Sequence, residues 1–309
     1  MQVLVFSPFA ADQMREALTN LPHVSAVVSP DKTEFLAALP EADAVAITMS
    51  LYDAEIGHAI AASSRIRWIH FVSSGIDPIL VYPPQAHVRI TNSPQAWAPV
   101  VAEHAVALLL ALQRGIPQMI SAQAKTSWNQ VDLRPRMRSL EANSVAILGF
   151  GSIGQRIATL LKPFGSHIVA VARSERDHPD VEKVVAIERL DDVLASSDVL
   201  ICALPRSPEA VGLLSERRLA LLPPQAIVVN VGRGDIIDEA ALVDGLRSGR
   251  IGGAGLDVFE REPVPADHPL WRTPNLILSP HVAGMGRSRL IERLVAACVE
   301  NANEMLSSA

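Results

Sequence analysis

Residues 144–161 read SVAILGFGSIGQRIATLL, and this stretch decides the fold of the chain. Val145 to Leu148 form a short apolar run that suits a buried parallel strand. Gly149, Gly151 and Gly154 follow with the spacing G-x-G-x-x-G, and the apolar residues after them recur on one helical face. This spacing also marks simple tight turns. The strand before it and the helix after it favour a dinucleotide-binding turn instead.

Each glycine of this turn has an expected role in holding a pyrophosphate. The first permits the tight turn, the second lets the backbone approach the phosphates, and the third lets the helix pack close to the strand. The N–H groups at the helix start, with the helix dipole behind them, attract the anion. The expected cofactor contacts in this stretch are therefore Gly149, Gly151, Ser152, Ile153 and Gly154.

The composition bounds the class of protein. With 309 residues, the chain is long enough for two domains and a large core. Hydrophobic residues make up 49% and charged residues 19%, which is typical of a compact globular protein and not of a disordered one. The formal net charge of −6 gives no reason to expect a nucleic-acid partner.

Cysteine usage and apolar runs indicate the cellular setting. Cys202 and Cys298 lie in apolar runs, so we expect small buried side chains and neither a disulfide nor a metal site. The N-terminus lacks a basic segment followed by a long apolar core, so no secretory signal is expected. The longest apolar run, near residues 100–112, contains Glu103 and His104 and is too short to span a bilayer. We therefore expect a cytoplasmic protein without a membrane partner.

The first part of the chain alternates short apolar runs with helical patterns, which predicts a parallel sheet covered on both faces. The expected strands are 3–6, 24–28, 44–47, 69–72 and 88–91, and the expected helices are 11–20, 31–39 and 53–62. Asp31 and Asp53 are the expected N-caps of the last two helices. The loop VSSGID, residues 72–77, follows the fourth strand at the edge where open α/β sheets bind ligands. Gly75 either lets backbone amides approach an anion there or only makes a turn.

Residues 92–99, which contain Pro94 and Pro99, predict a crossover, and a long buried helix is expected from about 100 to 114. His104 within this helix is expected to be packed or locally paired before it is catalytic. The more polar residues 115–140 suggest an arm over the surface, against another subunit.

A second α/β series begins at residue 144. Its expected strands are 145–148, 167–172, 199–203, 226–231, 254–258 and 276–279, which match a doubly wound dinucleotide domain. A final helix is expected at about 285–308, with its packing left open.

The end of the second strand in this series bears on the choice of dinucleotide. In NAD sites a carboxylate at this point accepts hydrogen bonds from the adenosine ribose. Here the strand HIVAVA ends at Ala172, and Arg173 and Ser174 follow it. Arginine makes bidentate contacts with phosphate, so Arg173, helped by Arg176, suits a 2′-phosphate. Two nearby acidic residues leave a solvated charged loop as the alternative. We predict NADP(H) in preference to NAD(H).

Three later segments place polar residues after apolar strands. Arg233 follows the strand in IVVNVGRGDIID, Asp257 and Glu262 follow the strand in GLDVFEREP, and His281 follows the strand in LILSPHVAG. These strand ends share the edge of the glycine turn, which puts Arg233, Glu262 and His281 within reach of one cofactor. Each alone also fits a structural role, as a strand cap, a surface charge or a packed histidine.

These segments closely resemble the D-isomer-specific 2-hydroxyacid dehydrogenase family. The motifs VAILGFGSIG, ALPRSPEAVGLL, NVGRGDIID, GLDVFEREP and SPHVAG occur in family order over about 140–285, and VSSGID adds weaker support. One departure is Arg206, where the family often carries leucine. The resemblance implies an α/β protein of two doubly wound parallel-sheet domains. A Rossmann dinucleotide domain, 95–285, would be inserted into a flavodoxin-like substrate domain, 1–94 plus 286–309, and closure of the cleft between them would exclude water.

The resemblance also implies roles for the polar residues. His281 would give a proton to the substrate carbonyl oxygen as hydride arrives at carbon, and Glu262 would favour the protonated imidazole and orient it. Arg233 would hold the substrate carboxylate and polarise the carbonyl. Asp257 would meet the nicotinamide carboxamide. The remaining implied contacts are Ser74 and Gly75 for the substrate carboxylate, and Ser174, Leu204, Pro205, Val231 and Gly284 for the cofactor.

We therefore predict a reductase that prefers NADPH and converts a small 2-oxo acid, of the glyoxylate or hydroxypyruvate class, to the D-2-hydroxy acid. Formate oxidation on the same fold is disfavoured by Glu262, because the resemblance would then call for an amide partner to the histidine. A cofactor-sensing interaction protein is the alternative from another class, since related corepressors keep the fold. The resemblance and the long buried helix suggest a homodimer.

Overall fold

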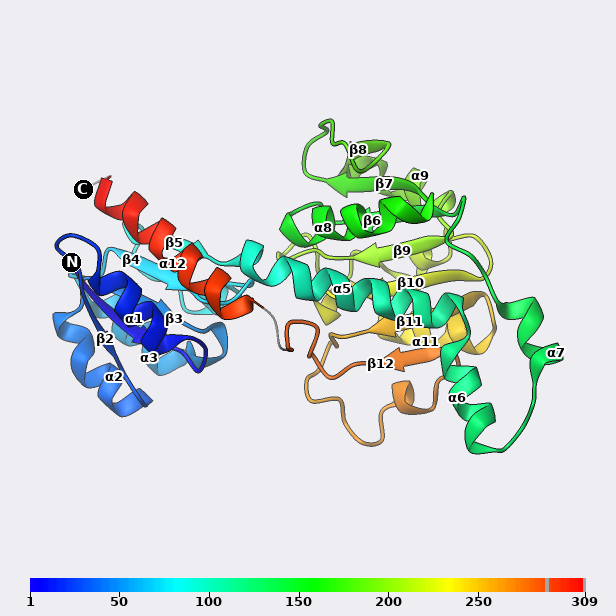
Figure 1. Ribbon diagram of the computed structural model, residues 1–309, viewed down its shortest axis with the longest axis horizontal. Coiled ribbons are helices and arrows are strands. Elements are labelled where there is room, and N and C mark those ends of the chain that lie inside the picture. Colours follow the sequence, from blue (N-terminus) through cyan, green and yellow to red (C-terminus); the bar gives the residue numbers. More distant parts are fainter. Residues whose placement is uncertain (287–288, 308–309) are drawn as a thin grey trace. The chain divides into compact units, whose positions relative to one another are not determined.

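The computed structural model describes residues 1–286 and 289–307. Residues 287, 288 and 308 of the predicted final helix lie outside this description. The chain divides into two compact units (Figure 1). Unit 1 comprises Met1–Trp97 and Gly286–Ala309, and unit 2 comprises Ala98–Met285.

Unit 1 is built on a parallel sheet of five strands in the order β2-β1-β3-β4-β5. This is the flavodoxin-like order, which has its switch point between β1 and β3. All five predicted strands are present: β1 (Gln2–Phe6), β2 (Ser25–Val28), β3 (Ala44–Ile47), β4 (Trp68–Phe71) and β5 (Arg89–Asn92).

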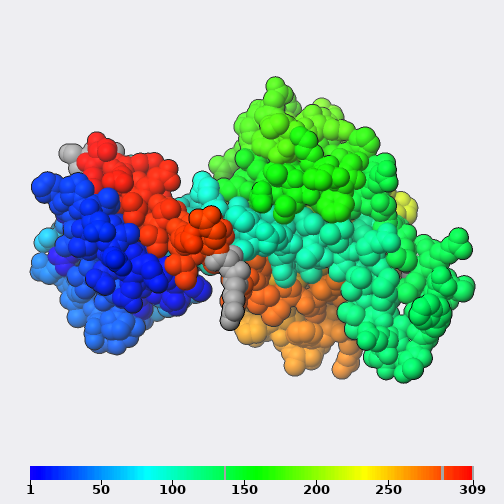
Figure 2. Space-filling model, viewed as in Figure 1, coloured from blue at the N-terminus to red at the C-terminus, as the bar shows by residue number. Residues whose placement is uncertain are grey.

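Helices cover both faces of this sheet, because alternate residues of each strand point to opposite sides. On one side Val3 and Val5 of β1 share a core with α1 and α12, and on the other Leu4 and Phe6 share a core with α2 and α3. The C-terminal helix therefore belongs to unit 1, where it lies over the N-terminal segment (Figure 2). The bounds are α1 (Ala11–Thr19), α2 (Lys32–Ala38), α3 (Ala54–Ala62), α4 (Pro78–Val81) and α12 (Leu290–Ser307), with the short 3-10 turns η1 (Leu39–Glu41) and η2 (Met49–Leu51).

Local caps start two of these helices as predicted. The Asp31 carboxylate accepts a hydrogen bond from the amide of Glu34, and the Asp53 carboxylate accepts one from the amide of Ile56. Each satisfies one of the amides that a helix start leaves without a partner. Both predicted N-caps are confirmed.

The crossover predicted at residues 92–99 is wrong in detail, because helix α5 (Pro94–Gln113) already begins there. Proline is tolerated in the first turn of a helix, and Pro94 is its first residue. The helix continues through Pro99. With 20 residues, α5 is long and apolar enough to cross a membrane by length and composition, contrary to the prediction from its shorter apolar run. Half of its most apolar window is buried within the protein, as in a core helix.

Unit 2 is built on a parallel sheet of seven strands in the order β12-β11-β10-β9-β6-β7-β8. Six were predicted: β6 (Ser144–Leu148), β7 (His167–Ala172), β9 (Val199–Cys202), β10 (Ala226–Asn230), β11 (Ile251–Leu256) and β12 (Leu276–Leu278). The seventh, β8 (Lys183–Ala186), pairs with β7 at the edge of the sheet, and its Val184 also forms a single antiparallel bridge with Arg176. Its four residues and polar flanks give too weak an apolar signal for prediction. The order is that of a doubly wound dinucleotide-binding sheet, with its switch point between β6 and β9.

Helices α5 and α8 (Ser152–Leu161) cover one face of this sheet, and α9 (Leu190–Ala195) and α11 (Glu239–Arg247) cover the other (Figure 1). Glycines bring α5 very close to β11: a Cβ on Gly255 would lie 3.0 Å from Cβ of Leu108. The other elements are α6 (Ile116–Ala124), α7 (Gln130–Leu133), α10 (Glu216–Leu219), η3 (Arg134–Arg136), η4 (Lys162–Phe164), η5 (Ile187–Arg189), η6 (Gly234–Ile236) and η7 (Pro269–Arg272).

The two cysteines are buried in different units, Cys202 on β9 and Cys298 on α12. Burial raises the pKa of both thiols to about 12, which leaves them protonated at neutral pH. Both behave as the small apolar side chains that were expected.

Candidate active site

The glycine turn of unit 2 joins β6 to α8 at the switch point of the sheet. Gly149 has φ +97°, a conformation that favours glycine, and an added Cβ would lie 2.8 Å from the carbonyl carbon of Ala203 on the neighbouring strand end. A Cβ on Gly154 would overlap the carbonyl oxygen of Gly149, so this glycine sets the close packing of the helix on the turn. Gly149 and Gly154 are thus required by the fold itself.

Gly151 differs from its two neighbours in the motif. An added Cβ would meet nothing within 4 Å, so the packing of the protein does not require glycine at this position. Gly151 is also the N-cap residue of α8, and it offers no side chain to the amides of Ser152, Ile153 and Gly154. A phosphate group fits such an open helix start, because the free amides and the helix dipole both favour an anion.

Two side chains hold the turn from outside. The carbonyl oxygen of Phe150 accepts hydrogen bonds from the Arg176 guanidinium at 2.6 Å and from Nε2 of Gln155 at 3.1 Å. The Arg176 guanidinium also lies 5.5 Å from the centre of the Phe150 ring, and the His178 ring meets that ring edge-on at 4.9 Å. The structure thus ties Arg176 to the glycine turn.

Arg173 and Ser174 follow β7, which ends at Ala172 as predicted, and both are exposed. The pKa of Glu209 is lowered by hydrogen bonds from its own backbone amide and from Ser207, and further by the nearby charge of Arg173. Arg173 therefore lies on the same edge of the sheet as the loop after β9. No acidic residue occupies the end of β7.

The loops after β9 and β10 touch backbone to backbone. A Cβ on Gly232 would lie 3.0 Å from the amide nitrogen of Leu204, so glycine lets the two loops approach closely. Arg206, the departure from the family pattern, pairs with the Asp235 carboxylate at 2.8 Å. Leu204, Pro205 and Val231 thus stand beside the glycine turn, and Arg206 links their loop to the segment that carries Arg233.

The segment around Arg233 is held by the buried side chain of Asn230. Its amide nitrogen donates to the carbonyl oxygen of Arg233 at 2.9 Å, and its amide oxygen accepts from the amide of Gly232 at 3.0 Å. Nη1 of Arg233 donates to the carbonyl oxygen of Gly232 at 2.7 Å. Asn230, the last residue of β10, therefore fixes the direction in which the chain leaves the sheet.

Asp257 organises the loop that carries His281. One carboxylate oxygen accepts from the hydroxyl of Ser279 at 2.6 Å and from the amide of Val282 at 2.9 Å, and the other accepts from the amide of Ala283 at 3.0 Å. The Asp257 side chain is 2% exposed. These three contacts are all with the loop that follows β12, and the same loop carries His281 and Gly284.

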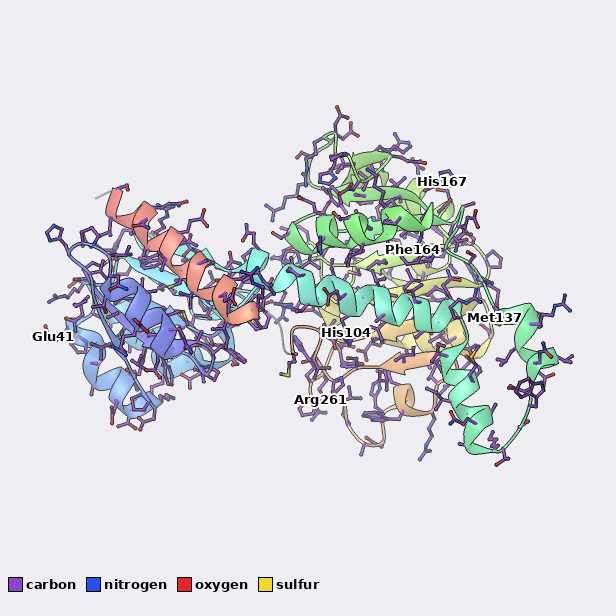
Figure 3. The ribbon with its side chains drawn as sticks, in the orientation of Figure 1. Glu41, His104, Met137, Phe164, His167 and Arg261 are labelled. Carbon is purple, nitrogen blue, oxygen red and sulfur yellow. The ribbon has the colours of Figure 1, made fainter. Side chains whose placement is uncertain are left out.

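His104 lies on α5, where Figure 3 labels it. Its Nε2 lies 2.8 Å from the hydroxyl oxygen of Ser279 and 3.6 Å from the Asp257 carboxylate. The structure therefore shows the local pairing expected for this histidine, and its partners are the residues that shape the His281 loop.

His281 itself has φ +53°, in the left-handed region that non-glycine residues rarely adopt. Its amide donates to the carbonyl oxygens of Asp257 and Ser279, both at 2.9 Å, which stabilises this conformation. Nδ1 of His281 lies 2.6 Å from Oε2 of Glu262, and the other oxygen of Glu262 accepts from the amide of Phe259 at 3.0 Å. The imidazole is thus oriented by a carboxylate that is itself fixed to its own turn.

Ser74 and Gly75 belong to unit 1, in the loop after β4. The carbonyl oxygens of Val72, Ser73, Ser74 and Gly75 all accept hydrogen bonds, from Trp97, the amide of Ser93, Asn92 and Ser73 respectively. Across a planar trans peptide the next N–H points away from the carbonyl. The amides of Ser74 and Gly75 are therefore turned away from these partners.

Within unit 2 the structure brings together the glycine turn, the loop of Leu204 and Pro205, the Arg233 segment and the Glu262–His281 pair. These loops are also held by residues that were not predicted from the sequence: Asn230, Gly232, Gly234 and Glu239. The N-x-G-x-G spacing of NVGRG and the Asp-Glu pair at the start of α11 are the sequence features that could have indicated them. Among residues 1–286 and 289–307, no group of three or more histidine, cysteine or acidic side chains is placed to hold a metal ion.

Comparison with known proteins agrees with this geometry. Residues 106–283 match the model of the NAD binding domain of D-isomer specific 2-hydroxyacid dehydrogenases. The D-3-phosphoglycerate dehydrogenase of Mycobacterium leprae is 33% identical over 282 residues, which are 91% of this chain and 52% of that protein. The glyoxylate reductase of Aeropyrum pernix is 35% identical over 248 residues, 77% of this chain and 73% of that protein. The chain spans about half the length of the phosphoglycerate dehydrogenases that it matches.

Solved structures give the same result. A D-isomer specific 2-hydroxyacid dehydrogenase family protein from Aeromonas salmonicida has a TM-score of 0.84 and 29% identity, covering 99% of this chain and 96% of that chain. A D-isomer specific 2-hydroxyacid dehydrogenase from Xanthobacter autotrophicus, described in complex with NADPH and MES, has a TM-score of 0.82 and 26% identity, covering 99% and 95%. The motifs, the strand order and these matches agree, and the chain belongs to the D-isomer specific 2-hydroxyacid dehydrogenase family.

Proposed function

We propose that this protein reduces a small 2-oxo acid to the D-2-hydroxy acid with a nicotinamide cofactor. The observation that carries the proposal is the Glu262–His281 pair, 2.6 Å apart, on the same sheet edge as the glycine turn. A proton donor beside a dinucleotide cradle is what carbonyl reduction requires. We take unit 2 as the dinucleotide-binding domain and unit 1 as the substrate domain, as the sequence predicts.

His281 acts as the general acid in this proposal. Its Nδ1 is engaged by Glu262, so Nε2 is the nitrogen that can give a proton to the substrate carbonyl oxygen. The Glu262 carboxylate stabilises the imidazolium and keeps the ring in one orientation. The side chain of His281 is 47% exposed, which leaves it accessible to a substrate. In the oxidative direction His281 takes the proton back.

Arg233 and the loop of Ser74 and Gly75 would bind the substrate carboxylate. A guanidinium forms bidentate, charge-assisted hydrogen bonds with a carboxylate, and its charge polarises the neighbouring carbonyl group. In unit 1, the amides of Ser74 and Gly75 are turned away from their hydrogen-bonded carbonyls and suit an anion. These groups fix the acid end of the substrate and leave its side chain to other contacts.

The residues present fit a dinucleotide, and Gly149, Gly151, Ser152, Ile153 and Gly154 would hold its pyrophosphate. When bound, the reduced nicotinamide supplies the hydride. Leu204, Pro205, Val231, Asp257 and Gly284 would line the same edge, with Asp257 also shaping the His281 loop. The open position above Gly151 and the bare helix start support this assignment.

NADPH is the proposed preferred form of the cofactor. Arg173 and Ser174 are exposed at the end of β7, where NAD-binding sheets carry a carboxylate. Arg176 lies in the same loop, and its hydrogen bond to the carbonyl oxygen of Phe150 joins this loop to the glycine turn. The preference is proposed from these residues, because solved structures of similar proteins are described with NADPH and with NAD.

The proposed substrates are glyoxylate and hydroxypyruvate. The A. pernix glyoxylate reductase supports this class, and the M. leprae D-3-phosphoglycerate dehydrogenase, at comparable identity, makes phosphorylated 3-carbon acids the competing class. Glu262 disfavours a formate dehydrogenase, and a cofactor-sensing interaction protein remains the alternative from another class.

A substrate panel tests the proposal. Initial rates would be measured for glyoxylate, hydroxypyruvate, phosphohydroxypyruvate and a bulkier 2-oxo acid, each with NADPH and NADH. We expect turnover of the first two, faster with NADPH. Turnover of phosphohydroxypyruvate alone would move the substrate to the competing class. Equal or better rates with NADH would overturn the cofactor preference, and no turnover of any acid would favour the sensing protein.

We also propose that the protein is a homodimer. The arm of residues 115–140 exposes large apolar side chains, among them Trp128, which is 92% exposed, and Val131, which is 83% exposed. Apolar groups at such exposure are typical of surfaces that a partner covers. Light scattering during size-exclusion chromatography should give twice the mass of one chain; the mass of one chain at micromolar concentration would contradict the proposal.

A further inference from the structure

The turn after β11 is held by two carboxylates, and only one of them touches His281. Arg261, labelled in Figure 3, lies in this turn. The amide of Phe259 donates to Glu262 at 3.0 Å, and the next amide, that of Glu260, donates to Oε1 of Glu239 at 2.7 Å. Consecutive backbone amides are thus bound by side chains from the turn itself and from a distant part of the sequence.

Glu239 comes from the segment that carries Arg233. It is the first residue of α11, which Asp238 caps by accepting a hydrogen bond from the amide of Ala241 at 3.0 Å. Between Arg233 and α11, Gly234 lies directly against the backbone of Phe259 and Glu260, where an added Cβ would overlap both. The Arg233 segment and the Glu262 turn are therefore joined at two points, one steric and one through the Glu239 carboxylate.

The position of Glu239 is unusual for a carboxylate. The residue is 8% exposed, and its other oxygen faces Nε2 of His268 at 3.8 Å. Burial raises the pKa of Glu239, and the hydrogen bond from Glu260 and the nearby His268 act in the opposite direction. Burying a carboxylate costs free energy unless it is paired. The hydrogen bond from the Glu260 amide therefore offsets a substantial part of the cost of burying Glu239.

Building on the proposed function, we propose that Glu239 is a positioning residue for proton transfer. It accepts the Glu260 amide and so fixes the turn from which Glu262 orients His281. Without this acceptor the turn is free to shift, and the imidazole loses its alignment with the substrate carbonyl. Because Glu239 touches neither substrate nor cofactor in this scheme, its loss should lower kcat and leave binding unchanged.

Two substitutions at this position separate the hydrogen bond from the charge. Glu239→Gln keeps an oxygen that can accept the Glu260 amide, whereas Glu239→Ala removes it. We expect kcat to fall by about 10- to 100-fold in Glu239→Ala and to stay within about 3-fold of wild type in Glu239→Gln, with KM for the 2-oxo acid and the Kd for NADPH within about 3-fold in both. Asp244→Asn, which removes an exposed carboxylate from the same helix, is the matched control and should leave kcat unchanged.

A double-mutant cycle tests whether Glu239 acts through Glu262. In Glu262→Gln the alignment is already impaired, so adding Glu239→Ala should lower kcat by less than about 3-fold further. If Glu239→Ala does not fold, Glu239→Asp carries the same prediction, because it keeps the charge but withdraws the oxygens by one methylene group.

The outcomes are distinct. A Glu239→Ala variant that loses stability but keeps kcat, a Glu239→Gln variant as slow as Glu239→Ala, or multiplicative losses in the double variant would each overturn the positioning role. Failure of the proposed function shows differently, as unchanged turnover in Glu262→Gln and His281→Ala or as absence of turnover in the wild type.

Discussion

Replacing Gly234 with alanine should separate the Arg233 segment from the turn that carries Glu262. An added Cβ would lie only 1.8 Å from the carbonyl carbon of Phe259, and Cβ contacts under 3.0 Å essentially do not occur in proteins. The neighbouring atoms are backbone, so no flexible side chain can give way. The carbonyl carbon of Phe259 must therefore withdraw by about 1.2 Å.

A displacement of this size has two consequences. Overpacking of backbone against backbone should lower the free energy of unfolding by about 1–3 kcal/mol. A 1 Å displacement of a catalytic group can cost about 100-fold in rate, so kcat should fall by about that factor. NADPH binding depends on the glycine turn after β6 and should change little.

Gly252→Ala is the matched control. Its added Cβ would overlap the backbone of Gln225, but at the opposite end of β11, away from the Glu262 turn. Both variants would be compared by urea denaturation, by NADPH fluorescence titration and by kcat per NADPH-binding site. Similar destabilisation with a loss of kcat only in Gly234→Ala is expected. Equal kcat losses in the two variants, or an unchanged kcat in Gly234→Ala, would show that the packing of Gly234 on Phe259 does not position Glu262.

Three further predictions follow from buried and exposed positions. Burial lowers the pKa of His70 from 6.5 to about 4, so between these pH values the unfolded chain binds a proton that the folded chain does not. From pH 6.5 to pH 4 this difference should lower the free energy of unfolding by about 3 kcal/mol. In urea titrations at several pH values, His70→Gln should remove this part of the pH dependence, whereas His167→Gln, at an exposed position, should keep it. Gly151→Ala should have the same free energy of unfolding as the wild type, because the site has room for a Cβ. Its affinity for NADPH, measured by fluorescence titration, should be at least about 10-fold weaker. An unchanged affinity would show that the pyrophosphate does not bind at this turn. Arg173→Ser should raise KM for NADPH by about 10-fold and leave KM for NADH unchanged, because it removes a charge-assisted contact with the 2′-phosphate; parallel losses with both cofactors would contradict that assignment.

Much of the fold was predictable because its elements are local. The apolar runs gave the five strands of unit 1 and six of the seven strands of unit 2, and aspartates at helix starts gave two N-caps. The edge strand β8 was missed because it has only four residues, of which one is buried, so its apolar signal is weak. The start of α5 was misplaced because proline is compatible with the first turn of a helix, so the sequence signal for a break was ambiguous there.

The candidate site was predictable to the extent that its groups sit at strand ends. Glu262 and His281 are 19 positions apart, but the parallel sheet brings their strand ends together, and the structure places them 2.6 Å apart. The supporting residues act through the backbone of other loops. Asn230 and Glu239 accept or donate to main-chain groups whose positions depend on the tertiary fold, so residue type and spacing do not reveal their partners. The roles of Arg173 and Arg176 also depend on the tertiary fold, because the guanidinium of Arg176 binds the carbonyl oxygen of Phe150 and leaves Arg173 as the candidate for the 2′-phosphate.

The proposed function depends above all on His281 as the donor of the proton in reduction of a 2-oxo acid. It is tested most directly by kcat for glyoxylate reduction with NADPH in the wild type and in His281→Ala, with Kd for NADPH measured on the same samples. We predict that kcat falls by about 100-fold or more while Kd stays within about 3-fold, because a general acid contributes about 10²- to 10⁴-fold and the cofactor cradle lies in other loops. Full activity in His281→Ala, with NADPH bound as in the wild type, would show that His281 is not the proton donor.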